Sequence, residues 1–380
     1  MNSPALILLL IFLFFQRTAA NSVEEITWTY SGSVGQSEWS EYFPDCGGAS
    51  QSPVDVTTTQ TKYDPSLVPV TPLGYSQHGN QPFSLHNNGH TVVIELPGWM
   101  GLQGLPWLFT AVQLHLHWGN GSPGHGGSEH TIDGRSADAE LHVVHYNSEL
   151  YPNMSAAMTQ RDGLAVLGIF IETGEETNPA FNNIINYMSR IRHADQKEFI
   201  PAFDVQSLLP RSLGRYYRYN GSLTTPPCYQ SVIWTVFQER VQISKAQLLK
   251  METILYSSKA EDSHRMLLQD NYRVTQSLNH RVVLASFSAE SGKELSSGEV
   301  TAIVIGVMCG CVGLAVIVRF IVKTIRSSSS WDVLHNNRPA PSPRVNDQEH
   351  SKEKKQDLAL STTSEAEKKE EPSPSSPAEP

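Results

Sequence analysis

Short runs in which hydrophobic and polar residues alternate dominate the chain from about residue 21 to residue 290. Alternation with a period of two is typical of β-strands that bury one face. It predicts strands in TVVIEL, AVQLHLHW, ELHVVHY, LAVLGIFIE, SVIWTVF and RVVLASF. Two other segments, NPAFNNIINYMSRI and SKAQLLKMETIL, space their hydrophobic residues three and four apart, which predicts helices. Because strands and helices do not alternate regularly, the pattern favours one α+β domain over 21–290 with a mainly antiparallel sheet.

The two ends of the chain differ in composition from this domain. Residues 1–20 begin with an apolar run and end in small residues, which is typical of a secretory signal peptide, with an uncleaved membrane anchor as the alternative. Residues 291–299 form a polar stalk. The uncharged stretch from Val300 to Val318 is long enough to cross a lipid bilayer, which predicts a transmembrane helix over 300–322. Residues 323–380 are rich in Ser, Pro, Glu and Lys, which predicts a disordered tail whose partners the sequence does not identify.

Charge predicts how the chain is oriented in the membrane. Arg319, Lys323 and Arg326 lie at the C-terminal side of the apolar stretch, so the positive-inside rule predicts a cytoplasmic tail. The expected protein is single-pass type I in the plasma membrane, with its large domain extracellular. Gly306 and Gly310 form a GxxxG pattern that favours a homodimer, or they are incidental small residues. The formal net charge of -10 argues against nucleic-acid binding.

Histidines gather between QLHLHWG and AELHVVHYN, although the whole chain has only 14. In a strand Gln113, His115 and His117 share one face, and so do Glu140 and His142 in the second segment. If the two segments are antiparallel neighbours, three imidazoles converge. Three nitrogen ligands with an open fourth position are typical of a catalytic zinc site, and Gln113 and Glu140 are then expected to accept the ligands' second N–H. The alternative is a half-buried strand with ordinary hydrogen-bonded histidines.

Six motifs occur together and in order, namely QLHLHWG, GSEH, AELHVVHYN, LAVLGIFIE, NGSLTTPPC and VIWTVF. They strongly resemble the α-class carbonic anhydrases of the transmembrane, extracellular type, over about Trp28 to Phe287. The resemblance implies a central twisted ten-stranded sheet with peripheral helices. It also implies zinc-dependent, reversible hydration of carbon dioxide to bicarbonate and a proton by attack of zinc-bound hydroxide, with His115, His117 and His142 as metal ligands.

The resemblance also implies roles for residues around the metal. His90, in HNNGH, matches the family's proton shuttle, with Asn88 organising the relay water, whereas an isolated surface histidine is usually only solvated. Thr224 would accept a hydrogen bond from the hydroxide and donate one to Glu129, which orients the nucleophile. Val93 departs from the polar residue common there in the family, so inhibitor binding and the water network cannot be carried over.

A carbon dioxide pocket is implied at Val144, Val166, Leu223, Thr225, Val232 and Trp234. Taken singly, each apolar residue among them is typical of plain core. Cys46 and Cys228 are the two cysteines of the predicted ectodomain and match a disulfide of the secreted and membrane-bound relatives, with two free thiols as the alternative. Three sequons are accessible to glycosylation if the domain is exported, at Asn120, Asn153 and Asn220.

Two other functions are compatible with this sequence. An inactive carbonic-anhydrase-like ectodomain would serve as an adhesion or scaffold module. The loss of one of the three zinc histidines would indicate such a module in the sequence, but all three histidines are present. A zinc esterase would use the same hydroxide, and comparing ester hydrolysis with carbon dioxide hydration in one preparation discriminates it.

Overall fold

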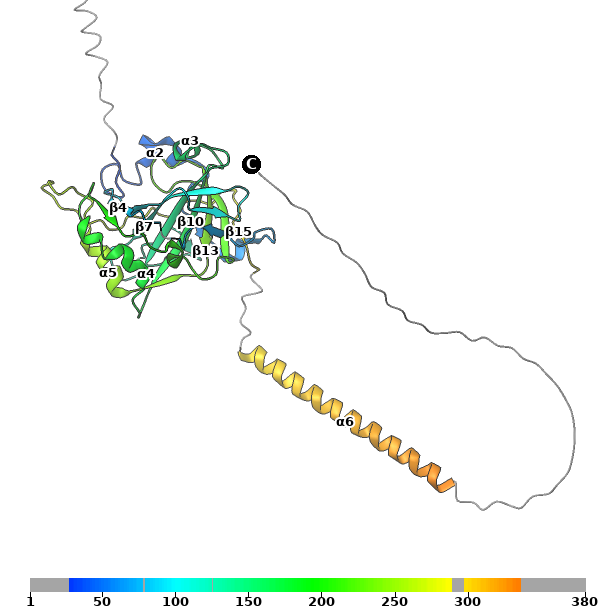
Figure 1. The fold of residues 1–380 in the computed structure, drawn as a ribbon. Coiled ribbons are helices and arrows are strands. Elements are labelled where there is room, and N and C mark those ends of the chain that lie inside the picture. Colours follow the sequence, from blue (N-terminus) through cyan, green and yellow to red (C-terminus); the bar gives the residue numbers. More distant parts are fainter. Residues whose placement is uncertain (1–26, 78, 125, 289–296, 336–380) are drawn as a thin grey trace, which may run out of the picture. The chain divides into compact units, whose positions relative to one another are not determined.

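The computed structural model describes residues 27–77, 79–124, 126–288 and 297–335 (Figure 1). The predicted signal peptide, His125, most of the predicted stalk and the tail after His335 lie outside these residues. The chain divides between Glu294 and Leu295 into two units. Within the described residues, the first unit is a mixed α and β body and the second is one long helix.

A large β-sheet forms the centre of the first unit (Figure 1). Its main path runs in the order β11 (Lys197–Ile200), β4 (Phe83–Asn87), β5 (Val92–Glu95), β7 (Phe109–Trp118), β9 (Ala139–Asn147), β10 (Leu164–Gly174), β13 (Val232–Phe237), β12 (Tyr216–Gly221), β15 (Leu284–Ala285) and β2 (Lys62–Tyr63). The strands off this path are β3 (Thr71–Leu73), β6 (Gly101–Gln103) and β14 (Val241–Ser244). A separate pair consists of β1 (Asp55–Val56) and β8 (Thr131–Ile132).

The expectation of a ten-stranded, mainly antiparallel sheet is met only roughly. In the described residues thirteen strands belong to the sheet, ten of them on its main path. β10 runs parallel to both β13 and β14, and β15 runs parallel to β2, so the sheet is mixed. A parallel neighbour needs a long crossover connection, and the chain between β10 and β13 is long enough to include a helix and two other strands.

Alternation located the strands better than it predicted their lengths. TVVIEL and SVIWTVF contain β5 and β13, whereas RVVLASF contributes only the two residues of β15. A strand's length depends on where a partner backbone is available, and the alternation of side chains does not report that.

The two segments predicted as helical contain α4 (Pro179–Ile185) and α5 (Lys245–Ile254). Asn178 caps α4 by accepting a hydrogen bond from the Ala180 N–H, and Ser244 caps α5 in a capping box with Gln247. The other described helices of this unit are α2 (Trp39–Tyr42), α3 (Met154–Ala157) and the 3-10 helices η1 (Pro44–Gly47), η2 (Thr58–Gln60), η3 (Met188–Arg190) and η4 (Val205–Leu208).

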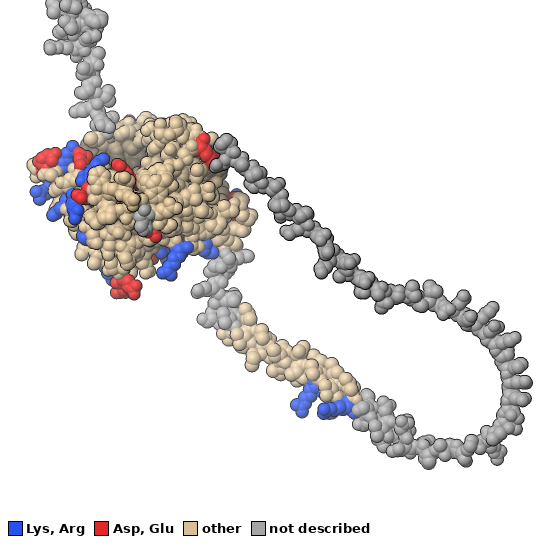
Figure 2. Space-filling view, viewed as in Figure 1, with Lys and Arg blue, Asp and Glu red and all other residues tan. Residues whose placement is uncertain are grey.

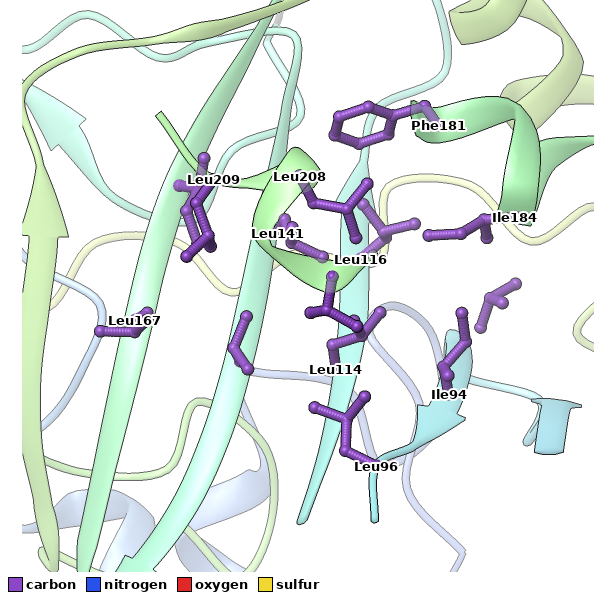
Figure 3. Close-up of a cluster of buried hydrophobic side chains, with 14 of the residues drawn as sticks. Ile94, Leu96, Leu114, Leu116, Leu141, Leu167, Phe181, Ile184, Leu208 and Leu209 are labelled. Carbon is purple, nitrogen blue, oxygen red and sulfur yellow. The ribbon is translucent and has the colours of Figure 1, made fainter. Parts of the chain in front are cut away.

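Buried aliphatic side chains cover one face of the sheet (Figure 3). Leu116 of β7 and Leu141 of β9 are fully buried and belong to one cluster with Phe181 and Ile184 of α4. Burying such a side chain contributes about 1.5–3 kcal/mol. The alternate residues of β7 and β9 point to the opposite face, which is free to carry other chemistry.

The second unit is α6 (Ser297–His335). Its segment Thr301–Arg326 is long and apolar enough to cross a membrane, and its surface is uncharged until Lys and Arg side chains near its C-terminal end (Figure 2). The predicted span at 300–322 lies within α6, but residues 323–335, expected in the tail, are helical as well. The helix can continue because no Gly or Pro occurs after Gly313 until Pro339.

Candidate metal centre

A change of register in β7 brings the histidines together. The pairing of β7 with β9 shifts between Ala111 and Gln113, so β7 has one extra residue there. A shift of one residue exchanges the faces to which side chains point. Beyond this bulge His115 lies directly opposite His142, with His117 two residues further along the same face.

His115, His117 and His142 each direct one ring nitrogen to a common point. Nε2 of His117 is 3.1 Å from Nδ1 of His142, and Nε2 of His115 is 3.3 Å from the same Nδ1. Two nitrogen ligands of a tetrahedral zinc ion, each 2.0–2.1 Å from the metal, lie about 3.3 Å apart. These two spacings therefore fit Zn²⁺, and all three nitrogens lie within 4.8 Å of one another.

The other nitrogen of each ring faces a protein oxygen. These oxygens are Gln113 Oε1 for His115 at 3.0 Å, the Asn271 carbonyl for His117 at 2.7 Å and Glu140 Oε1 for His142 at 2.7 Å. Such oxygens accept hydrogen bonds, so each histidine donates its N–H there and its converging nitrogen is a lone pair. Three lone pairs that face one another repel unless a cation lies between them, so the donor set is arranged for a metal.

Burial keeps the imidazoles in the form that binds metals. Burial, reinforced by His117 and His142, holds the pKa of His115 well below its usual range. Burial also lowers the pKa of His117, although Glu129 opposes this shift. Both rings are therefore neutral at pH 7, as a metal ligand must be.

Glu140 connects this cluster to a second buried histidine. Its Oε1 accepts from Nε2 of His142 and from Nδ1 of His130, each at 2.7 Å, and its Oε2 accepts from the backbone N–H groups of Glu129 and His130. Burial alone would raise the pKa of Glu140, but His130 and His142 hold it well below its usual range. The carboxylate is ionised with both oxygens in use, so it orients His142 and is not free to bind a second ion.

Glu129, by contrast, has one unused oxygen. Its Oε1 accepts from the Arg273 N–H at 2.9 Å, whereas its Oε2 has no hydrogen-bond partner in the described part of the chain and lies 3.4 Å from Nε2 of His117. Thr224 is buried and lies next to the predicted pocket residues Leu223 and Thr225 in the sequence. The hydrogen bond that the resemblance implies from Thr224 to this oxygen is not formed. Leaving a buried acceptor unsatisfied costs about 1–3 kcal/mol, more for a charged group, so this oxygen is suited to accept a hydrogen bond or to face a cation.

The loop that carries Thr224 and Thr225 is anchored at both ends. At its start the Ser222 N–H donates to Ser52 Oγ at 3.0 Å. At its end the Cys228 N–H donates to the Thr225 carbonyl at 2.9 Å, and Cys228 forms a disulfide with Cys46. The predicted disulfide is confirmed, and it ties this loop to the N-terminal part of the domain.

An apolar wall borders the cluster. Four of the predicted pocket residues are at most 4% exposed and share one hydrophobic cluster with Leu223, namely Val144, Val166, Val232 and Trp234. Val166 lies opposite Val144 on one side and Trp234 on the other. The Trp234 ring centroid is 4.8 Å from that of His142, so the wall begins at the proposed ligands.

His90 lies on the turn between β4 and β5. Its ring stacks on Trp28, with centroids 3.8 Å apart and planes at 10°. Burial lowers the pKa of His90. Asn88 Oδ1 accepts the N–H groups of His90 and Thr91 at 2.9 and 2.8 Å, so Asn88 shapes the turn. The expected role of Asn88 in organising the relay water stays a prediction.

Two contributors to the site were not anticipated from the sequence. Asn271 supplies a carbonyl to His117 across 154 residues, and Arg273 supplies an N–H to Glu129 across 144. Both contacts use backbone atoms, which every residue type carries, so no motif in the sequence could have signalled them.

Three convergent histidine nitrogens beside an apolar wall define the candidate active site of a metalloenzyme, and comparison with known proteins identifies its class. The chain belongs to the eukaryotic-type carbonic anhydrase family, whose model matches residues 34–287, and it is a carbonic anhydrase.

Relatives with the same activity in their names cover most of the chain. Carbonic anhydrase 12 of Homo sapiens is 45% identical over 284 residues, 75% of this chain and 80% of that protein. Carbonic anhydrase 6 of Homo sapiens is 39% identical over 284 residues, 74% of this chain and 89% of that protein. Carbonic anhydrase 7 of Mus musculus is 39% identical over 270 residues, 69% of this chain and 98% of that protein.

Proposed function

We propose that this carbonic anhydrase is a zinc-dependent lyase that reversibly hydrates carbon dioxide to bicarbonate and a proton at the extracellular face of the membrane, and so takes part in pH regulation. The convergence of three unprotonated nitrogens from His115, His117 and His142 carries this proposal. An inactive scaffold module would have no need to hold three histidine tautomers toward one point.

Bound Zn²⁺ supplies a water whose pKa is near 7, a value for which carbonic anhydrases are themselves the standard example and which is not specific to this chain. Gln113, Asn271 and Glu140 hold the three imidazoles in place. The proposed substrate pocket is uncharged and consists of Val144, Val166, Leu223, Thr225, Val232 and Trp234. A pocket of this kind admits a small apolar molecule such as carbon dioxide and disfavours charged competitors.

Thr224 and Glu129 are proposed to orient the nucleophile. The unpartnered Oε2 of Glu129 is a strong acceptor. If the Thr224 hydroxyl turns to donate a hydrogen bond to this oxygen, the Thr224 oxygen remains an acceptor for the nucleophile. A nucleophile that donates its hydrogen to Thr224 would direct its lone pair toward the substrate, which is the geometric requirement for efficient attack.

His90 is proposed to carry the proton of each turnover to the solvent, with Asn88 supporting the relay. A histidine can accept and release a proton near pH 7 with little energetic loss in either direction. Its half-buried position on the turn before β5, where solvent reaches part of the side chain, supports this role.

The membrane arrangement is part of the proposal. The signal peptide at 1–20 is removed, the catalytic domain at 21–290 is extracellular, and the stalk at 291–299 leads to a span at 300–322 and a cytoplasmic tail at 323–380. The apolar helix α6 supports the span. The segments NNGHTV and RYNGSLTTPPCYQSV favour the transmembrane type, nearest to the isozyme numbered fourteen and then to twelve.

N-glycosylation of three asparagines and homodimerisation through α6 are also proposed. Asn120, Asn153 and Asn220 are exposed, as N-glycosylation of an exported domain requires. Gly306 and Gly310 leave open space on α6 where a second helix could approach closely.

The experiment that tests the proposed function is carbon dioxide hydration by the full-length chain in detergent, measured beside its zinc content and beside ester hydrolysis. Zinc near one per chain with fast hydration supports it. Zinc-loaded protein without hydration would overturn it in favour of a binding module, and ester hydrolysis alone would favour an esterase. Removal of N-glycans from intact cells, followed by a shift in mass, tests the extracellular placement.

A further inference from the structure

Five residues on neighbouring strands lie side by side across the sheet, and we call them the register row. Lys197 of β11 pairs with His86 of β4, and His86 pairs with Val93 of β5. Val93 pairs with His115 of β7, and His115 pairs with His142 of β9. Residues directly opposite each other in antiparallel strands point to the same face. His86 therefore shares the face of the proposed metal ligands.

Distance and exposure place His86 between the cluster and the solvent. Neighbouring strands are about 4.8 Å apart, so the His86 backbone is about 10 Å from that of His115. Lys197 at the edge of the sheet is exposed, His86, Val93 and His115 are half-buried, and His142 is buried. The side chain of Val93, between the two histidines, is short and cannot hydrogen-bond. Water can therefore cover it without being held there.

The charges around His86 come from three segments that pack on β4. Burial lowers the pKa of His86 most, Lys197 lowers it further, and Asp195 and Glu95 raise it. Lys197 lies on β11, Asp195 in the segment before β11, and Glu95 on β5. The opposing charges leave the imidazole neutral at pH 7 and able to accept a proton. The two carboxylates stabilise the charged ring once it has formed.

His90, the residue expected to relay protons, is placed differently. Its ring is stacked on Trp28 and lines a surface groove together with Lys259, Asp262 and His264. It belongs to the turn after β4, whereas His86 belongs to β4 itself. A strand residue is held by its two neighbouring strands, so His86 keeps a constant position relative to the cluster.

We propose that His86 is a second proton relay of this enzyme, working in parallel with His90 over the register row. The inference rests on the proposed zinc-dependent hydration. Each hydration of carbon dioxide by water yields bicarbonate and one proton. The neutral His86 ring accepts that proton through water above Val93 and becomes an imidazolium, which then transfers the proton to a buffer base and is neutral again.

Oxygen-18 exchange between carbon dioxide and water tests this relay in the full-length chain in detergent. The method yields two rates, the interconversion of carbon dioxide and bicarbonate at the metal and the release of labelled water, which requires a proton. The variants are His86→Gln, His90→Ala and the double variant. His280→Gln is the matched control, because His280 is exposed and lies in a groove beside Arg281 and Tyr229, away from the register row.

Two parallel relays predict a specific pattern. Each single variant should lower water release about twofold, and the double variant should lower it at least tenfold, since general acid–base groups contribute roughly 10²–10⁴-fold. The interconversion rate and the His280→Gln control should not change. Added imidazole should restore water release in the double variant, which a merely structural role of His86 would not allow.

Three results would overturn the inference. If water release in the double variant equals that of His90→Ala, His86 carries no protons. If the His86→Gln variant loses interconversion as well as water release, His86 supports the fold of the site. If the unmodified chain shows no interconversion at all, the proposed function itself fails, and that result is distinct from the first two.

Discussion

The two faces of strands β7 and β9 both carry buried side chains and are chemically opposite. On one face Leu116 and Leu141 are 0% exposed and share one hydrophobic cluster with Phe181 and Ile184 of α4 (Figure 3). On the other face His117 and His142 are 1% exposed, and Glu140 is 0% exposed. The same two strands supply both faces through alternate residues.

Burial alone therefore does not distinguish a core from a site in this molecule. The leucine face needs its volume filled, and its energy comes from removing apolar surface from water. The histidine face needs a partner for each polar atom, because an unpaired polar atom is costly in the interior. Substitutions should consequently cost stability on the first face and function on the second.

The largest effect is expected from His117→Ala, which removes one converging nitrogen from the histidine face. Zinc content should fall from about one per chain to near zero. Carbon dioxide hydration should fall roughly 10³-fold, about 4 kcal/mol in activation free energy. Metal analysis and stopped-flow hydration measure both quantities. The exposed His280→Ala variant should keep both, and an active, zinc-loaded His117→Ala protein would remove the cluster from the mechanism.

The leucine face is tested by Leu141→Ala. The free energy of unfolding should fall by about 2–5 kcal/mol, because the variant loses buried apolar surface and leaves a cavity. Denaturant unfolding measures this, and zinc bound per folded molecule should not change. The matched control is Leu249→Ala on α5, where the side chain is 58% exposed and the loss should stay within about 0.5 kcal/mol. Equal losses at both positions would contradict the comparison.

One histidine lies on the leucine face, and its pH dependence sharpens the contrast. His145 is fully buried, with Nε2 beside the Tyr75 hydroxyl and Nδ1 beside the Ala165 carbonyl. Burial lowers the pKa of His145 from 6.5 to about 4. Between these values the unfolded chain binds the extra proton, so the stability from this residue is complete above pH 6.5 and is lost as the pH falls toward 4.

Going from pH 7 to pH 5 should therefore cost about 2 kcal/mol of unfolding free energy through His145. A His145→Gln variant should be less stable at pH 7 but should lack this part of the pH dependence. Unfolding curves at both pH values measure the difference. An identical slope in the variant and in the unmodified chain would show that His145 is not responsible.

A smaller effect than that of His117→Ala is expected from Glu140→Gln, which keeps one acceptor but removes the charge that orients His142 and His130. Zinc affinity should fall by about 10–100-fold, roughly 1.4–2.7 kcal/mol, as for other partners of metal-bound histidines. Competition with a chelator measures it. Glu261→Gln, an exposed carboxylate, is the control and should leave the affinity unchanged. Unchanged affinity in Glu140→Gln would mean that the hydrogen bond rather than the charge matters.

Much of this arrangement could be predicted from the sequence because strand alternation is local. The positions of His115 and His117 on one face, and the helices at α4 and α5, required only neighbouring residues. The apolar span within α6 is likewise a property of composition. The number of strands and their parallel neighbours were not predictable in this way, since they depend on how distant segments pair.

The site shows the same division. Gln113 and Glu140 lie two residues before a proposed ligand, and the structure places each oxygen within 3.0 Å of that ligand's ring. It was not expected that Oε2 of Glu129 has no hydrogen-bond partner in the described part of the chain. Whether Thr224 donates to this oxygen depends on the geometry of a loop that is distant in the sequence. His86 was passed over for a different reason: nothing in HNNGH tells which of its two histidines faces the cluster.

By itself the sequence determined which side chains share a face, which family the motifs resemble and which stretch can cross a membrane, because these depend on residue type and local period. Tertiary structure alone decided the bulge that sets His115 opposite His142. It also decided that Asn271 and Arg273 reach the cluster from more than 140 residues away. Register and backbone contacts of this kind arise from the packing of whole strands, and backbone N–H and C=O groups are the same in nearly every residue.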